Sequence, residues 1–232
     1  QGFCLTSGQH APTPRPTQGD LPNSCSQGKD RFMAKTDTRI QKKNQAAIMD
    51  AGLAVFSQFG FRGSTLDQVA EAAGLSKPNL LYYFRSKDAI YTALLAKLLE
   101  NWLEPLREIN AEGDPVQELL GYANRKLDMS QHYPRESRLF ANEIIQGAPR
   151  IADVLQGELR GLVDEISQVI NDWVAAGRIK SVDPRHLIFS IWALTQHYAD
   201  FDVQVRAILG DVDPFDGAQA YLEAMLRGLL EV

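Results

Sequence analysis

The chain has 232 residues, of which 44% are hydrophobic and 23% are charged, and its formal net charge is −5. This composition is that of an ordinary globular protein with an ample core, and it argues against a fibrous or wholly disordered chain. No apolar run reaches the roughly 18 residues of a membrane-spanning helix. The two cysteines, Cys4 and Cys25, give neither a disulfide framework nor a zinc cluster. We therefore expect a soluble, cytoplasmic protein.

The first segment, residues 1–36, is rich in Gly, Pro, Ser, Thr and Gln and lacks helical periodicity, which is typical of disorder. It has no basic start followed by an apolar stretch, so it does not resemble a signal peptide. Met33 opens a run that looks like a natural start for this kind of protein. We therefore interpret residues 1–32 as a dispensable extension or a start-site artefact, and we place two domains at residues 37–90 and 91–232.

An apolar stripe predicts a first helix over residues 38–59. Its members are Ile48, Ala51, Leu53, Val55, Phe56 and Phe59. Two short helices follow. Ser64 or Thr65 caps the first of them and Gly74 ends it, because a residue without Cβ turns the chain at no steric cost. Ser76 caps the second, with Pro78 in its first turn. This order predicts a helix-turn-helix unit.

The second short helix carries the residue types that contact DNA. Lysines and hydroxyls at a helix start suit phosphate oxygens, Asn or Lys can read base edges in the major groove, and Tyr can do either. The candidate DNA-binding residues are Thr65, Ser76, Lys77, Asn79, Tyr82, Tyr83 and Lys87. Taken alone, these residues also fit a plain helical hairpin with a solvated polar face.

A longer match favours DNA binding. The run TLDQVAEAAGLSKPNLLYYFRSKDAIY resembles the N-terminal DNA-binding segment of the TetR/AcrR family of transcriptional repressors. The matching positions are Gly74, Leu75 and Ser76 in the turn, Leu81, Tyr82 and Phe84 at the end of the recognition helix, Lys87 and Asp88 after it, and Phe56, Gly60, Phe61 and Thr65 before it. The resemblance implies an N-terminal three-helix DNA-binding domain.

The charges are divided unevenly along the chain. Residues 33–90 contain eight Lys or Arg against five Asp or Glu, while residues 91–232 contain 13 against 22. The acidic total therefore does not argue against DNA binding, because the local balance at the interface is what meets phosphate. Further phosphate candidates are Arg39, Lys42 and Lys43, although a solvated helix face explains each of them equally well.

The remaining chain reads as helices, so the predicted fold class is all-α. A long helix from Ser86 to Leu103 links the head to a larger C-terminal body. Asp-Pro pairs at Asp114, Asp183 and Asp213 each place a capping acid before a proline in the first helical turn. The predicted body helices are 115–132, 135–146, 150–176, 184–203 and 214–230.

The family resemblance implies that the body dimerises and holds a small effector. It assigns the last two helices to a homodimer interface, which would let two heads read a palindromic operator. The apolar surface expected there consists of Leu187, Ile188, Ile191, Leu194, Tyr221, Leu222, Met225, Leu226 and Leu229. The same residues also suit the core of a monomer.

Several segments, among them NWLEPL, HYPRESRLFANEIIQGAP and HLIFSIWALTQHYADF, are similar to a pyrimidine-utilisation repressor subgroup that responds to uracil and thymine. A pyrimidine needs an apolar or aromatic sandwich and an amide that both donates and accepts. Trp192 and Gln196 share one helix face and offer that pair. The resemblance makes these two and Trp102 and Leu103 the leading effector residues. Asn142, Glu143 and Lys126 are second-rank candidates, because they are polar groups on helices that we expect to face inward.

Other interpretations stay open at this point. Trp192 in an apolar run also fits a core position, and a regulator could instead sense apolar drugs or fatty acyl compounds. An enzyme acting on a pyrimidine would need Glu143 or His197 to work in isolation, because no phosphate-binding loop or nucleophile elbow is present in the sequence. The histidines, His10, His132, His186 and His197, are not spaced like metal ligands, so we expect no metal, no cofactor and no catalytic residue.

Overall fold

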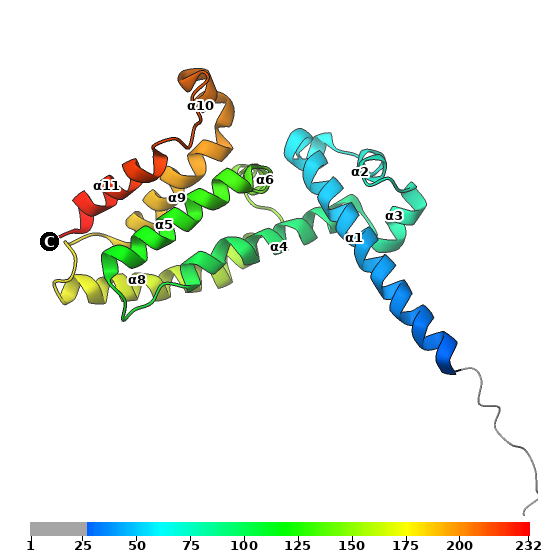
Figure 1. Cartoon of the computed structure of the whole chain (residues 1–232), viewed down its shortest axis with the longest axis horizontal. Helices are drawn as coiled ribbons and strands as arrows, with labels where there is room; N and C mark the ends of the chain where they lie inside the picture. Colours follow the sequence, from blue (N-terminus) through cyan, green and yellow to red (C-terminus); the bar gives the residue numbers. More distant parts are fainter. Residues whose placement is uncertain (1–26) are drawn as a thin grey trace, which may run out of the picture. The chain divides into compact units, whose positions relative to one another are not determined.

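The computed structural model describes residues 27–232, and every regular element in that range is a helix (Figure 1). The predicted all-α class is therefore confirmed. Most of the expected disordered extension, residues 1–36, lies outside the described residues. However, helix α1 (Gln27–Gly63) already begins at Gln27, so residues 27–36 are helical rather than irregular. Residues 43–232 form one compact unit, to which the descriptions below apply.

The N-terminal head consists of the later part of α1 together with α2 (Leu66–Ala72) and α3 (Lys77–Tyr83). The backbone of α1 leaves helical geometry at Gly60, with φ 68° and ψ 173°, which agrees with the predicted helix end near residue 59. The apolar stripe is buried except for Phe59, which is 48% exposed and was wrongly placed in the core. The head's buried core includes Ile48, Phe56, Val69, Leu80 and Ile90.

Local side chains set the bounds of α2 and α3 as the sequence predicted. Thr65 forms a capping box with Gln68, because its side chain accepts from the Gln68 N–H while the Gln68 side chain accepts from the Thr65 N–H. Gly74 has φ +67°, the left-handed conformation that ends α2. Ser76 caps α3 by accepting from the Asn79 N–H. These contacts fix the turn between the two helices.

Helix α4 (Lys87–Arg107) runs from the head into the body, with Ser86 as its N-cap. Its first turns pack closely on α1, where a Cβ built on Gly52 would lie 2.9 Å from Cγ2 of Ile90 and 3.3 Å from Cδ1 of Leu94. Only a glycine allows this approach of the two helices. The start of α4 is therefore part of the head.

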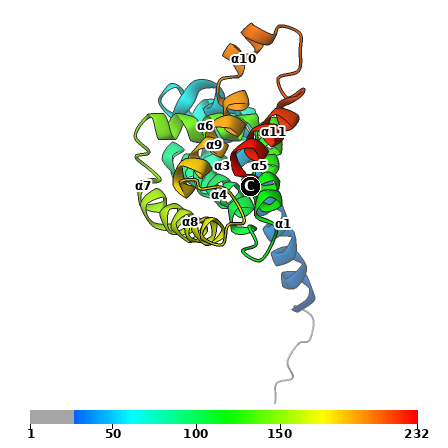
Figure 2. The same ribbon diagram turned by 90° about the vertical axis from the view of Figure 1, so that its left-hand side faces the viewer.

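The body is built around α5 (Pro115–His132) and α9 (Pro184–Asp200), which pack against each other (Figures 1 and 2). Helix α6 (Pro134–Ile145) and α8 (Arg160–Ala175) also contact α9, and α11 (Ala218–Leu230) contacts α5. Asp114 and Asp183 cap α5 and α9 through their carboxylates, as predicted. The body core lies between these helices.

The third Asp-Pro pair does not start a helix, so the predicted helix over residues 214–230 begins too early. Asp213 accepts instead from the Phe215 N–H, two residues on, in a local turn. Helix α11 begins at Ala218, after Gly217 with φ 74°. A short helix that the sequence did not predict, α10 (Asp202–Leu209), follows α9.

The predicted helix over residues 150–176 is divided in the structure. It consists of α7 (Ala152–Val154), a π-helical segment η1 (Leu155–Leu159) and α8. None of the described helices has the length and apolarity to cross a membrane.

The predicted dimer surface was wrong for five of its nine residues. The protomer's own core buries Leu187, Ile188, Ile191, Leu222 and Leu226. The apolar stripe of a helix must be covered by another element. Here α9 packs on α5 and α8, and α11 packs on α5, all within the same chain. Tyr221 and Leu229 remain exposed, together with Phe189 and Phe201, which the sequence did not single out.

Candidate DNA interface and effector site

Helix α3 presents most of the predicted DNA-binding side chains to solvent. Ser76, Lys77 and Asn79 are exposed at its start, and Tyr82 is 72% exposed near its end. Lys77 reaches back to α2, where its ammonium lies 2.9 Å from the Asp67 carboxylate. Since both partners are well exposed, this ion pair contributes little stability and leaves the lysine available to phosphate.

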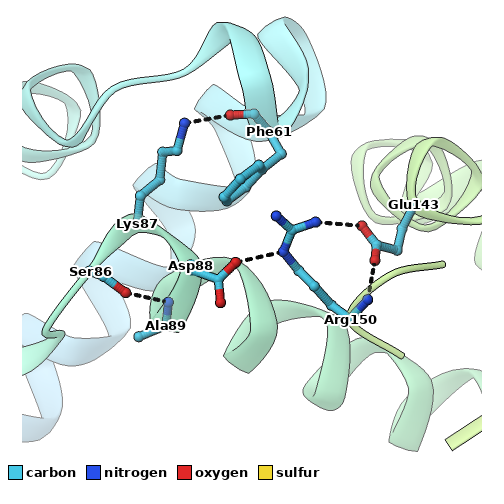
Figure 3. Close-up of polar contacts among 7 residues, drawn as sticks. All are labelled: Phe61, Ser86, Lys87, Asp88, Ala89, Glu143 and Arg150. Atoms are coloured by element: carbon cyan, nitrogen blue, oxygen red, sulfur yellow. Dashed lines mark hydrogen bonds and ion pairs between the residues drawn. The ribbon is translucent and has the colours of Figure 1, made fainter. Parts of the chain in front are cut away.

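Tyr83 and Lys87 have partners inside the head. The Tyr83 hydroxyl accepts from the side-chain amide of Asn44 on α1 at 2.9 Å. The Lys87 ammonium donates to the Phe61 carbonyl at 2.7 Å and lies 4.3 Å from the centre of the Phe61 ring (Figure 3). It also donates to the Ser64 carbonyl at 2.7 Å. Lys87 thus ties the start of α4 to the end of α1, a role that its predicted contact with phosphate does not explain.

The predicted effector residues fall into three separate groups in the body. The first group is Trp102 on α4 with Lys126 on α5. The Lys126 ammonium lies 4.8 Å from the centre of the Trp102 ring, and both residues are buried. The indole N–H of Trp102 has no hydrogen-bond partner among the described residues. Burial lowers the pKa of Lys126 to about 7, and the attraction of Asp200 only partly offsets that effect.

The second group lies one turn away along α5. The Trp192 indole donates to the Tyr122 hydroxyl at 2.5 Å, and the Trp192 ring packs on Phe189. Burial raises the pKa of Tyr122. Because Tyr122 and Lys126 are four residues apart, they share one face of α5. That face contacts Trp192 at one end and Trp102 at the other.

The third group is Glu143, which contacts an arginine rather than the residues above. Its carboxylate accepts from the backbone N–H of Arg150 at 2.8 Å and from the Arg150 guanidinium at 3.3 Å (Figure 3). Of the other predicted residues, Leu103 is buried, while Asn142 and Gln196 are half-buried. Trp102 and Trp192 therefore both contact one face of α5, at Lys126 and Tyr122 respectively. Glu143 belongs to a different hydrogen-bond network.

Sequence reasoning missed three polar residues near this part of α5. The first two are Asp200 and Ser137: Asp200 is partly buried, accepts from the Ser137 hydroxyl at 2.5 Å, and has a pKa raised mainly by burial. Tyr122 is the third. Its spacing of four from Lys126 was the available signal, because a tyrosine and a lysine on an otherwise apolar helix face need polar partners.

A cavity of about 370 Å³ lies elsewhere, between α4 and the α7–η1 segment. Its apolar lining includes Ala96, Leu99 and Val154, and Arg107 and Arg150 also border it. Arg107 is paired with Glu158. None of the predicted effector residues lines this cavity. Among the described residues, no group of three or more His, Cys, Asp or Glu side chains has the arrangement of a metal site.

Comparisons with known proteins match this architecture over nearly the whole described chain. Residues 48–94 match the family described as bacterial regulatory proteins, tetR family, and residues 95–231 match the YcdC-like protein C-terminal region. The chain is 47% identical over 185 residues to the HTH-type transcriptional regulator RutR of Escherichia coli K12, which covers 80% of this chain and 87% of RutR.

Solved structures show the same fold. The transcriptional regulator SCO4942 of Streptomyces coelicolor superposes with a TM-score of 0.64 at 24% identity, covering 81% of this chain and 98% of that one. The ketosteroid transcriptional regulator KstR2 of Mycobacterium tuberculosis gives a TM-score of 0.66 at 19% identity, covering 81% and 95%. With its helix-turn-helix head and helical body, the chain belongs to the TetR family and is a ligand-responsive, DNA-binding transcriptional regulator similar to RutR.

Proposed function

We propose that this protein is a cytoplasmic repressor of pyrimidine catabolism genes and that uracil, thymine or a related pyrimidine releases it from its operator. The resemblance of its head and body segments to the pyrimidine-utilisation subgroup supports this proposal. The main structural support is the buried pair of Trp102 and Lys126, where an indole N–H that has no hydrogen-bond partner within residues 27–232 lies beside a buried ammonium.

The two buried donors favour a ligand with carbonyl oxygens. An unpaired buried donor costs roughly 1–3 kcal/mol, and a ligand carbonyl can recover that free energy. A pyrimidine base displays two carbonyls around a flat ring, so it can accept from Trp102 or Lys126 while its face packs on an aromatic side chain. Trp192 and the half-buried amide of Gln196 lie on α9, which packs on the same helix α5.

An apolar effector fits this site less well, because it would leave the Trp102 indole N–H without an acceptor and would place no polar group beside the buried Lys126 ammonium. A catalytic role for Glu143 is not favoured either, since its carboxylate is already bonded to Arg150. His197 is exposed and stacks on Phe201 at 4.9 Å between ring centres. The named relatives are transcriptional regulators, and we assign no enzymatic activity to this chain.

On the DNA side, we propose that α3 enters the major groove, with Asn79 and Tyr82 reading bases while Ser76, Lys77 and Thr65 contact phosphates. We further propose a homodimer that reads a palindrome. The support for it is the exposed apolar side chains of α9 and α11, namely Phe189, Tyr221 and Leu229.

The proposed mechanism is a shift in population between two body conformations. Trp102 lies on α4, whose first turn is packed into the head at Gly52. A ligand that binds more tightly to one arrangement of α4 against α5 therefore favours one position of the head. In the ligand-bound state the two heads no longer match successive major grooves, and operator affinity falls.

The test combines calorimetry with operator binding. The protein first selects its operator from a random DNA library, and fluorescence anisotropy then gives the operator Kd with and without uracil or thymine. We expect one pyrimidine per chain and a weaker operator complex. Gln196→Ala and Trp102→Phe should weaken pyrimidine binding, whereas Lys97→Met, at an exposed lysine of α4, should not. If neither base binds, or if bound base leaves the operator Kd unchanged, the proposal is wrong.

Recognition by α3 is tested separately. Asn79→Ala and Tyr82→Phe should change the preference among operator sequences, because they remove groups that face base edges. Lys77→Ala should instead weaken binding to all sequences similarly and lower its salt dependence. A uniform loss for Asn79→Ala would contradict the assigned role in base reading.

A further inference from the structure

The loop between α6 and α7 brings one arginine of the body against the head. The loop turns sharply after α6, because Gly147 has φ +88° and Ala148 has φ +53°, a left-handed conformation that is rare for alanine. The Ala148 N–H donates to the Glu143 carbonyl at 2.8 Å, and the Ala148 side chain is buried. Glu143 then accepts from the Arg150 N–H at 2.8 Å. The loop is thus held in one conformation, with Arg150 at its end.

The Arg150 guanidinium contacts the head through two kinds of interaction. Its Nε donates to the Asp88 carboxylate in the first turn of α4 at 2.7 Å. Its Cζ lies 3.7 Å from the centre of the Phe61 ring (Figure 3). The same atom lies 5.1 Å from the centre of the Tyr91 ring. These two rings also contact each other, with 5.0 Å between their centres, where the end of α1 meets the start of α4. One side chain therefore bonds an acid of the head and stacks on the head's aromatic residues.

On the body side, the partner of Arg150 is almost completely buried. Glu143 is 1% exposed, and both of its carboxylate oxygens accept hydrogen bonds from Arg150. The Asp88 side chain, by contrast, is 60% exposed. A buried carboxylate needs its partner more than an exposed one does. Arg150 is consequently anchored in the body, and its contact with Asp88 is the one that can open at low cost.

A shared ring makes the contact sensitive to the position of α4. The Phe61 ring contacts two cations, with the Lys87 ammonium 4.3 Å and the Arg150 guanidinium 3.7 Å from its centre. Lys87 and Asp88 are neighbours at the start of α4. A shift of α4 along or about its axis therefore changes the distance from Asp88 to Arg150, while Glu143 keeps Arg150 in place.

We propose that Arg150 is a positioning residue that couples the state of the body to the orientation of the DNA-binding head, by linking the buried Glu143 to Asp88 and Phe61. It touches neither DNA nor effector in this scheme. The part of the inference that concerns the effector rests on the proposed function. The part that concerns the orientation of the head does not.

The experiment measures operator affinity and pyrimidine affinity in the same variants. Arg150→Met keeps the length and apolar stem of the side chain but removes its charge and donors. Arg150→Lys keeps the charge but cannot bond Glu143 and Asp88 together while stacking flat on Phe61. Arg185→Met is the matched control, because Arg185 forms an exposed ion pair with Asp164 at 2.8 Å on another part of the body.

In the effector-free protein, we expect Arg150→Met to weaken operator binding by about tenfold, because a head without this contact samples more orientations and loses more freedom on DNA. Asp88→Asn should give a similar loss, and the double variant should be no worse than either single variant. Additive losses for Arg150→Met and Asp88→Asn would overturn the proposal. So would a loss caused equally by Arg185→Met.

With uracil or thymine, Arg150→Met and Arg150→Lys should bind the base as tightly as the wild type does. The ratio of operator Kd values with and without base should fall from the wild-type coupling, typically about 5–150-fold, towards 1. A ratio equal to that of the wild type contradicts the proposed coupling. If the wild type binds no pyrimidine, the proposed function fails, and the effector-free comparison of Arg150→Met with Asp88→Asn still decides the role of Arg150.

Discussion

Two buried ionisable residues of the body, Glu143 and Lys126, differ in how completely the surrounding residues pair with them. Glu143 is 1% exposed, and an arginine bonds both of its carboxylate oxygens. Lys126 is 2% exposed, and its ammonium lies over the face of the Trp102 ring and is attracted by Asp200. The neighbouring Trp102 indole N–H has no hydrogen-bond partner in the part of the chain that the structure describes. A buried charge that is fully hydrogen-bonded within the chain stabilises the fold. A buried charge that lies beside a polar group without a partner is suited to binding a ligand.

The largest expected effect comes from removing the incompletely paired charge. Lys126→Met should raise the free energy of unfolding at pH 7 by roughly 4 kcal/mol, because burial lowers the pKa of Lys126 from 10.5 to about 7 and each unit of that change corresponds to about 1.4 kcal/mol. The same substitution should abolish pyrimidine binding. Urea unfolding and calorimetry give the two results, and Lys97→Met is the control for losing a surface charge.

The pH dependence tests the same residue. The pKa of Lys126 is about 7 in the folded protein, against an ordinary value of 10.5. Between these values the unfolded chain holds a proton that the folded chain has lost, so wild-type stability should rise with pH from about 7 to about 10.5. Below pH 7 both states are protonated, and the dependence should end. A rise that persists unchanged in Lys126→Met would show that another group causes it.

Removing the fully paired charge should have the opposite sign. Glu143→Gln should lower the free energy of unfolding by about 1–3 kcal/mol, because the charged Arg150 loses its buried partner. The matched control is Glu158→Gln, which affects the exposed pair with Arg107 and should cost less than about 1 kcal/mol. Thermal unfolding of the three proteins measures the difference. Equal losses would mean that burial does not separate the two pairs.

An intermediate effect is expected at the other end of the α5 face. Tyr122→Phe removes the acceptor of the Trp192 indole and should cost about 1 kcal/mol in stability. Its pyrimidine affinity should also fall if Trp192 orients the ligand. Tyr133→Phe, at an exposed tyrosine, should change neither quantity when measured by urea unfolding and calorimetry.

The smallest effect on stability should come from the exposed arm of the arginine network. Asp88→Asn should cost less than about 1 kcal/mol, because its carboxylate is 60% exposed and screened by salt. Urea unfolding at low and high salt should show the difference shrinking as salt increases. A large loss of stability that does not depend on salt would place Asp88 among the structural charges, with Glu143.

Local signals were enough to predict much of the fold. Thr65, Asp114 and Asp183 cap their helices as expected, because a cap depends only on residues within one turn. Asp213 misled the prediction since an aspartate before proline can equally form a tight turn with the residue two positions on, as it does with Phe215. The choice between the two depends on distant packing.

The candidate sites could be predicted from the sequence only where all of their residues lie on a single helix. The exposed face of α3 follows from sequence spacing, whereas the partners of Glu143 and Trp192 do not. Arg150 and Asp88 are 62 residues apart, and Trp192 and Tyr122 are 70 residues apart. An amphipathic stripe likewise shows that Leu222 and Leu226 are buried, but not whether their own chain or a second copy covers them.

The pair of Asp88 and Arg150 also bears on how regulators of this family can be recombined. The match to the DNA-binding family ends at residue 94, so a chimera joined there takes Asp88 from one parent and Arg150 from the other. A donor head with no acid at position 88 would still fold, and it should bind its own operator about tenfold more weakly, like Asp88→Asn. We expect such a hybrid to ignore its inducer until an aspartate is restored at that single position.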